Sequence, residues 1–128
     1  HKTLESLMSV SDVLSVCCPA SKETINLINK KTISLLPNGA IVTNVARGDI
    51  VDDDALIEAL DSKKVSAVGL DVYKNEPKLN PGYLKHSRAF VLPHLGSATF
   101  ETRTAMANLA IDNISEFFET GSCKNKVN

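Results

Sequence analysis

Glycine is scarce in this chain, and its spacing excludes the usual phosphate-binding loops. The six glycines among the 128 residues stand no closer than nine positions apart, so the G-x-G-x-x-G fingerprint of dinucleotide-binding folds is absent. No nucleophile elbow of the form Gly-x-Ser-x-Gly occurs either. If a nucleotide binds to this chain, the loop that cradles its pyrophosphate is not among these residues.

An excess of charge and long apolar runs are also lacking. The chain has 14 Lys and Arg against 15 Asp and Glu, which gives a net charge of -1. Such a balance provides no electrostatic attraction to phosphate backbones or anionic lipid, so nucleic acid and membrane surfaces are not expected as partners. The longest apolar stretches fall far short of the roughly 20 residues that cross a bilayer. We expect one soluble domain of modest size.

Cysteine and histidine are too few and too far apart for a disulfide framework or a metal site. The three cysteines include the adjacent pair Cys17 and Cys18, without a second pair at zinc-ligand spacing. His86 and His94 lie eight positions apart with no ligand at the right spacing, so no metal is predicted. A reducing compartment, the cytoplasm, is the expected location. At the end of a strand, Cys17 is predicted to be packed and inert, with a reactive thiol as the alternative.

Short apolar runs alternate with helical patterns along most of the chain. Strands are predicted at residues 13–17, 40–45, 65–70 and 89–92. Helical patterns cover residues 3–9, parts of 21–35, 55–60 after the acids Asp52, Asp53 and Asp54, and 99–119. Strands that are apolar on both faces and separated by helices call for a parallel sheet covered by helices. The predicted fold class is therefore α/β, with a doubly wound parallel sheet.

Polar side chains follow the predicted strands where each strand ends. Arg47 follows the second strand, Asp71 the third with Glu76 in the loop beyond it, and His94 the fourth. Open parallel sheets bind ligands at the carboxyl ends of their strands, and these residues would meet at that edge. Each also has a structural alternative: Arg47 as a surface ion-pair partner, Asp71 as a turn cap, and Glu76 and His94 as solvated loop residues.

Three segments resemble, in order and spacing, signatures of the D-2-hydroxyacid dehydrogenase family. They are residues 44–52 (NVARGDIVD), residues 69–73 (GLDVY) with Glu76-Pro77, and residues 92–99 (LPHLGSAT). The resemblance implies a Rossmann-type coenzyme domain. Residues 1–98 would form the second half of the NAD(P)-binding domain, and residues 99–128 a long helix and tail that pack on a substrate domain. The glycine loop is then expected upstream of His1.

The same resemblance implies roles for individual residues. Arg47 would bind the substrate's carboxylate and keto oxygen, His94 would be the general acid, and Glu76 would orient and charge His94. Guanidinium matches a carboxylate in a two-pronged fashion, and a carboxylate behind an imidazole fixes its tautomer. The implied cofactor-binding residues are Cys18 and Pro19 near the adenosine, and Val45, Ala46, Asp71 and Gly96 toward the nicotinamide. Cys17 departs from the family pattern, since many relatives have histidine there.

The implied activity is the NAD- or NADP-dependent reduction of a small 2-keto acid to the D-2-hydroxy acid. Residues 96–99 and 101–103, with Met106, Asn113 and Ile114, are most similar to glyoxylate and hydroxypyruvate reductases. The resemblance implies a homodimer. Phosphoglycerate dehydrogenase is one alternative. A corepressor of the C-terminal-binding type, which shares the fold, is another, and a turnover assay separates it from an enzyme. The stripe of Met106, Leu109, Ile114 and Phe117 is expected to stay exposed or to contact a partner.

Overall fold

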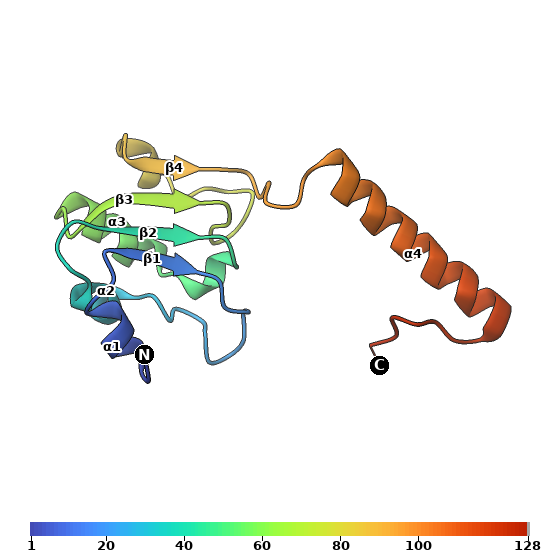
Figure 1. Cartoon of the computed structure of the whole chain (residues 1–128). Coiled ribbons are helices and arrows are strands. Elements are labelled where there is room, and N and C mark those ends of the chain that lie inside the picture. The colour runs from blue at the N-terminus through green and yellow to red at the C-terminus, as the bar shows by residue number, and fades with distance from the viewer. Residues whose placement is uncertain (128) are drawn as a thin grey trace. The chain divides into compact units, whose positions relative to one another are not determined.

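The computed structural model describes residues 1–127, and the chain divides into two compact units, His1–His94 and a second that begins at Leu95. Figure 1 shows the elements in chain order. The first unit contains α1 (Leu4–Met8), β1 (Val13–Val16), α2 (Lys30–Leu35), β2 (Ala40–Asn44), the 3-10 turn η1 (Gly48–Ile50), α3 (Asp53–Asp61), β3 (Val65–Leu70), the 3-10 turn η2 (Tyr83–Lys85) and β4 (Ala89–Val91). The second unit contains α4 (Phe100–Thr120).

The four strands form one parallel sheet in the order β1-β2-β3-β4, as predicted. Their register aligns the strand ends across the sheet. Val16 pairs with Asn44, Asn44 with Leu70, and Leu70 with Val91. The loops that follow the four strands therefore all leave from the same carboxyl edge.

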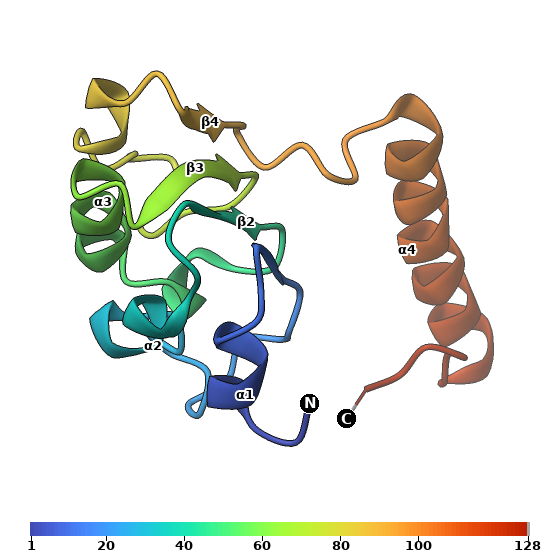
Figure 2. The same cartoon turned by 60° about the vertical axis from the view of Figure 1, so that its left-hand side comes forward.

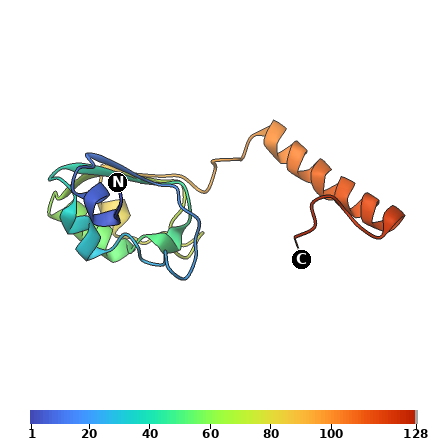
Figure 3. The same cartoon turned by 60° about the horizontal axis from the view of Figure 1, so that its bottom comes forward.

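The helices of the first unit lie on one face of this sheet. Parallel crossovers are right-handed, so consecutive steps in one direction place every connecting helix on the same side. Figures 2 and 3 show α1, α2 and α3 together on that side. The predicted Rossmann-like parallel sheet is confirmed, and the helices of the first unit cover only one of its faces. Alternate side chains on the other face, such as Val13 and Phe90, are 61% and 66% exposed.

Local capping explains where the helices begin. Asp52 caps α3 by accepting a hydrogen bond from the backbone N–H of Ala55 at 3.1 Å, and two further acids occupy the first turn. Those acids face the positive end of the helix dipole. Leu56 and Leu60 of α3 are completely buried against the sheet. The bounds predicted for most helices and strands lie within two residues of the observed bounds.

The long helix α4 is capped by Thr99, which accepts from the backbone of Thr102, and ends at Gly121 in the left-handed conformation with φ 76°. None of its residues is buried. The side chains of the predicted apolar stripe are each more than half exposed, as expected. Among the described helices, none has the combination of length and apolar character that a membrane span requires.

Candidate active site

The turn that carries Arg47 is built on a buried amide at the end of β2. Asn44 is 1% exposed, its side-chain N–H donates to the Arg47 carbonyl at 2.9 Å, and its Oδ1 accepts from the Ala46 N–H at 3.0 Å. Both ends of the amide are thus satisfied inside the protein, which fixes the backbone of residues 44–47. The guanidinium of Arg47 donates to the Ala46 carbonyl at 2.6 Å and remains exposed.

Gly48 joins this turn to the loop that follows β3. A Cβ atom on Gly48 would lie 2.1 Å from the carbonyl carbon of Tyr73 and 2.5 Å from the nitrogen of Lys74. Backbone atoms at those distances cannot move aside as a flexible side chain can. Only glycine therefore lets the Arg47 turn pack directly on the Tyr73 peptide, which fixes two loops relative to each other.

Glu76 and His94 form an ion pair whose geometry orients the imidazole. His94 Nδ1 lies 2.9 Å from Glu76 Oε2, and Glu76 Oε1 accepts from the Tyr73 backbone N–H at 3.0 Å. Because an ionised carboxylate can only accept hydrogen bonds, this contact places the hydrogen on Nδ1. Nε2 is then the ring nitrogen that can exchange a proton with a ligand. The His94 side chain is 47% exposed, so a ligand can reach it.

The backbone of His94 is held in an unusual conformation. Its φ is 57°, in the left-handed region that residues other than glycine seldom adopt. Its N–H donates to the Asp71 carbonyl at 2.9 Å, and the Asp71 N–H donates to the Asn44 carbonyl at 3.0 Å. Such conformations cost on the order of 1–3 kcal/mol and persist where the surrounding structure enforces them, often at functional sites.

Four predicted site residues therefore stand at the carboxyl edge of the sheet, as expected. Arg47, Glu76 and His94 are exposed residues, whereas Asp71 is only 9% exposed. Their loops are tied together by the packing of Gly48 on the Tyr73 peptide and by the bond from the His94 N–H to the Asp71 carbonyl. Gly96 belongs to the second unit, and its predicted contact with a cofactor stays a prediction.

The other predicted cofactor residues line one open pocket at the same edge. Its lining consists of Cys17, Cys18, Pro19, Ala20, Val45, Ala46 and Arg47. The prediction that Cys17 is packed was wrong, because its side chain is exposed. Burial alternates along β1, and Cys17 continues the exposed phase of Val13 and Ser15. Its Sγ lies 3.4 Å from Ser15 Oγ, while Cys18 packs partly against the core.

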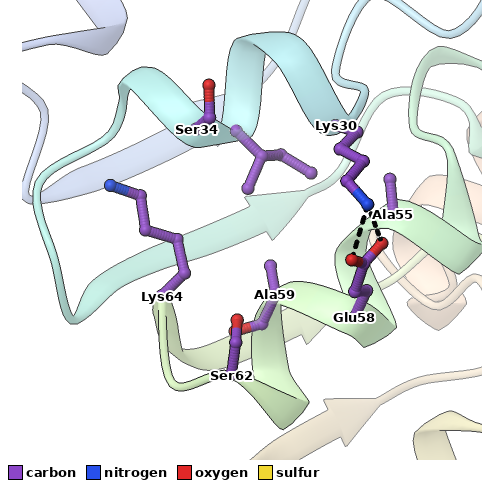
Figure 4. Close-up of a pocket in the computed structure, with 8 residues that line it drawn as sticks. Lys30, Ser34, Ala55, Glu58, Ala59, Ser62 and Lys64 are labelled. Atoms are coloured by element: carbon purple, nitrogen blue, oxygen red, sulfur yellow. Dashed lines mark hydrogen bonds and ion pairs between the residues drawn. The ribbon is translucent and has the colours of Figure 1, made fainter.

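A separate hollow lies between α2 and α3 and contains none of these residues (Figure 4). Ile33, Ala55 and Ala59 contribute its apolar lining. Lys30 and Glu58 form an exposed ion pair at its rim, with 2.6 Å between Nζ and Oε1. This hollow is on the helical layer, and its lining reaches Lys64, directly before β3.

The acids at the start of α3 are engaged within the protein. Asp53 is 8% exposed and accepts a hydrogen bond from the Tyr83 hydroxyl at 2.9 Å. Burial raises the pKa of the Asp53 carboxyl, and the bond from Tyr83 partly offsets this effect. Burial, followed by the nearby Asp53 carboxylate, raises the pKa of the Tyr83 hydroxyl well above its ordinary value. Over residues 1–127, no three His, Cys, Asp or Glu side chains gather as metal ligands would.

Comparison with known proteins shows that the segment containing the sheet matches a known family. The model of the D-isomer specific 2-hydroxyacid dehydrogenase NAD-binding domain matches residues 1–96. The chain belongs to this dehydrogenase family. The family resemblance predicted from the sequence is therefore confirmed, together with the Rossmann-like fold.

Relatives and solved structures of the family agree with this assignment. A glycerate dehydrogenase of Hyphomicrobium methylovorum is 43% identical over 92% of this chain, and a glyoxylate reductase of Pyrococcus furiosus is 39% identical over 91%. An NADPH-dependent glyoxylate/hydroxypyruvate reductase of Sinorhizobium meliloti, solved with NADP and malonate, has a TM-score of 0.93 at 35% identity over 99% of this chain and 40% of its own. The chain spans 37% of the length of the glycerate dehydrogenase and 35% of the glyoxylate reductase.

Sequence reasoning missed the residues that hold the predicted site residues in place. Asn44 and Gly48 lie inside the motif that carries Arg47, but their contacts had no assigned role. The sequence offered a signal for Gly48, since a glycine directly after a strand-end arginine indicates a close backbone approach. Nothing in the sequence indicated the Asp53–Tyr83 bond, whose partners are 30 positions apart.

Proposed function

We propose that this chain supplies the proton donor and the substrate anchor for the reduction of a small 2-keto acid, glyoxylate or hydroxypyruvate, to the D-2-hydroxy acid. The observation that carries the proposal is the Glu76–His94 pair at 2.9 Å, at the sheet edge where the Arg47 turn also stands. The names of relatives that reduce glyoxylate or act on glycerate support the substrate class.

His94 is the general acid in this proposal. Reduction of the carbonyl carbon leaves negative charge on the substrate oxygen, which needs a proton as it forms. Protonated His94 gives the hydrogen on Nε2 to the substrate oxygen. The hydrogen on Nδ1 stays on the ring, where it is donated to Glu76.

Arg47 anchors the substrate. Its guanidinium can donate two parallel hydrogen bonds to a carboxylate, which fixes the orientation of a small keto acid. The carbonyl of Ala46, which accepts from Nη1, restricts the side chain. Malonate in the Sinorhizobium reductase, a small dicarboxylate, supports an acid-binding site in this fold.

The pocket beside Arg47 fits one side of a nicotinamide coenzyme. The pocket lies at the carboxyl edge of a parallel sheet, which is the usual location for such a ligand. When bound, NADH or NADPH supplies the hydride. Cys18 and Pro19 would contact the adenosine side, and Val45, Ala46, Asp71 and Gly96 would lie toward the nicotinamide. The family model, which describes an NAD-binding domain, and the NADP-bound relative support this placement.

A chimera tests the proposal, because the chain itself contains no G-x-G-x-x-G loop and should bind the coenzyme weakly on its own. In this chimera, the 128-residue chain would replace the matching segment of the Hyphomicrobium glycerate dehydrogenase. Oxidation of NADH and NADPH would then be followed with glyoxylate and hydroxypyruvate. We expect His94→Asn to lower kcat by roughly 10²-fold to 10⁴-fold, the usual contribution of general acid catalysis. Arg47→Lys should instead raise KM, because a point charge cannot reproduce a two-pronged contact.

Arg88→Lys is the matched control, since Arg88 stands at the amino end of β4 and donates to the Leu60 carbonyl. It should leave both kinetic constants close to those of the unmodified chimera. Near-normal turnover in the His94→Asn chimera would refute the role of His94.

A further inference from the structure

Two segments that are distant in the sequence run alongside each other next to the candidate site. The first, residues 48–57, follows Arg47 directly, and the second, residues 73–83, contains Glu76. Gly48 packs on the Tyr73 peptide, and Gly82 lies so near Ile57 that a Cβ would stand 2.6 Å from its Cδ1. The Asn80 side chain donates to Asp54 Oδ1 at 3.0 Å. The position of the Glu76 segment is therefore defined against the segment that begins at Arg47.

The buried bond between these segments is the one from Tyr83 to Asp53. Tyr83 is 1% exposed and Asp53 8% exposed, with 2.9 Å between the hydroxyl and Oδ1. A carboxylate in this setting needs a donor, because burial of a charged group without one is costly. The neighbouring Asn80–Asp54 bond is exposed to water and competes with solvent. Asp53 and Tyr83 thus form a buried polar contact that joins the second segment to the first.

Between its two ends, the second segment contains no buried residue, and the Glu76 carboxylate is held within it by the Tyr73 backbone N–H at 3.0 Å. Residues 75–78, which include Glu76, are exposed. Tyr73 is fixed at one end by Gly48, and Tyr83 is fixed at the other end by Asp53. Release of either end would let the exposed part move, and the Glu76 carboxylate would no longer stay within hydrogen-bond distance of His94 Nδ1.

We infer that Asp53 and Tyr83 are positioning residues that keep Glu76 aligned on His94. Neither touches the proposed substrate or coenzyme residues; they act through the backbone of residues 73–83. The inference rests on the proposed function only for the catalytic role of the Glu76–His94 pair. The alignment of Glu76 on His94 can be measured without that role. Its direct consequence is a tautomer: with Glu76 in place, neutral His94 carries its hydrogen on Nδ1.

The tautomer of His94 can be measured in the 128-residue chain by ¹⁵N NMR of its imidazole, with the signal assigned by its loss in His94→Asn. We expect the Nδ1–H form to predominate in the wild type at a pH where the ring is neutral. Tyr83→Phe should shift the population toward the Nε2–H form that free histidine prefers, in the same direction as Glu76→Gln. Asp53→Asn keeps an acceptor oxygen for the tyrosine hydroxyl and should retain most of the Nδ1–H form.

Thr32→Val is the matched control for loss of a buried hydroxyl. Thr32 is 8% exposed and donates to the Leu27 carbonyl in the α2 region, so its loss should weaken the fold without changing the His94 tautomer. Should Tyr83→Phe fail to fold, the double variant Asp53→Leu with Tyr83→Phe removes both partners and leaves no buried carboxylate unpaired. This double variant should show the same tautomer shift.

An unchanged His94 tautomer in every folded variant that lacks the Asp53–Tyr83 bond would overturn the inference. A tautomer shift of equal size in Thr32→Val would also overturn it, because the effect would then follow general loosening of the fold. The proposed function fails separately, through normal turnover of the His94→Asn chimera, and that result would leave the tautomer measurement unaffected.

Discussion

The helical layer and the carboxyl edge of the sheet are built by different rules. Where α2 and α3 cover the strands, most of the buried contacts are made by apolar side chains such as Ile33, Leu56 and Leu60. At the carboxyl edge, Asn44 is buried, His94 is left-handed and glycine packs on backbone. An apolar layer tolerates exchange of one hydrophobic side chain for another of similar size. The edge does not, because each contact there needs one particular residue.

The largest effect is expected from Gly48→Ala. Its Cβ would meet the Tyr73 carbonyl carbon at 2.1 Å, so the Arg47 turn and the loop after β3 must separate. We expect a loss of about 3 kcal/mol or more in unfolding free energy, the upper range for overpacking against atoms that cannot yield. Urea denaturation followed by circular dichroism measures this loss.

Gly69→Ala provides the comparison within a strand. There the nearest atom to a new Cβ is Thr43 Cγ2 at 3.4 Å, an ordinary contact at the uncovered face of the sheet. Alanine should change the unfolding free energy by less than about 1 kcal/mol. It lowers the conformational entropy of the unfolded chain, and this gain in stability offsets the slight crowding. Equal effects of the two substitutions would contradict the distinction between the edge and the strands.

The sequence was sufficient to predict the strands, the main helices and the edge where the site residues stand. Apolar runs of strand length and the acids before Ala55 have local causes, namely burial and helix capping. The register of parallel strands then brings Arg47, Asp71 and His94 to one edge. Cys17 was predicted wrongly because a short apolar run does not reveal which of its faces is covered.

The contacts that hold the site together could not be predicted for a related reason. The packing of Gly48 on Tyr73 and the bond from Tyr83 to Asp53 join residues far apart in the chain. Each depends on the exact relative placement of two loops, which no periodic pattern encodes. The uncovered face of the sheet was missed because a strand with apolar residues in both phases resembles one buried on both sides.

The burial of Tyr83 beside the Asp53 carboxylate leads us to expect a pH dependence of stability of intermediate size. The folded state raises the pKa of Tyr83, and the unfolded chain ionises near the ordinary value of about 10. The contribution of Tyr83 is therefore complete below pH 10 and declines as pH rises above it, because the unfolded state then gains by losing the proton. The decline should approach about 1.4 kcal/mol per pH unit for one proton. Urea titrations of wild type and Tyr83→Phe between pH 8 and pH 11 would measure it.

The difference between the two proteins isolates Tyr83, since every other ionisable group is present in both. Wild type should exceed Tyr83→Phe in stability by an amount that is constant to about pH 10 and shrinks above it. Parallel curves throughout the alkaline range would show that Tyr83 ionises equally in the folded and unfolded states.

The smallest effect is expected on the helical layer, from the ion pair of Lys30 and Glu58. Its Nζ–Oε1 distance of 2.6 Å is shorter than most distances at the carboxyl edge, but the two side chains are 76% and 59% exposed. Water screens such a pair, and ordering two long side chains costs entropy, so exposed pairs contribute between about 0 and 1 kcal/mol. Glu58→Gln should therefore lower the unfolding free energy by about 0.5 kcal/mol or less at low salt, and the difference should fade as ionic strength rises. A loss comparable to that of Gly48→Ala would mean that surface charge, and not close packing at the strand ends, is what makes a position of this protein intolerant of change.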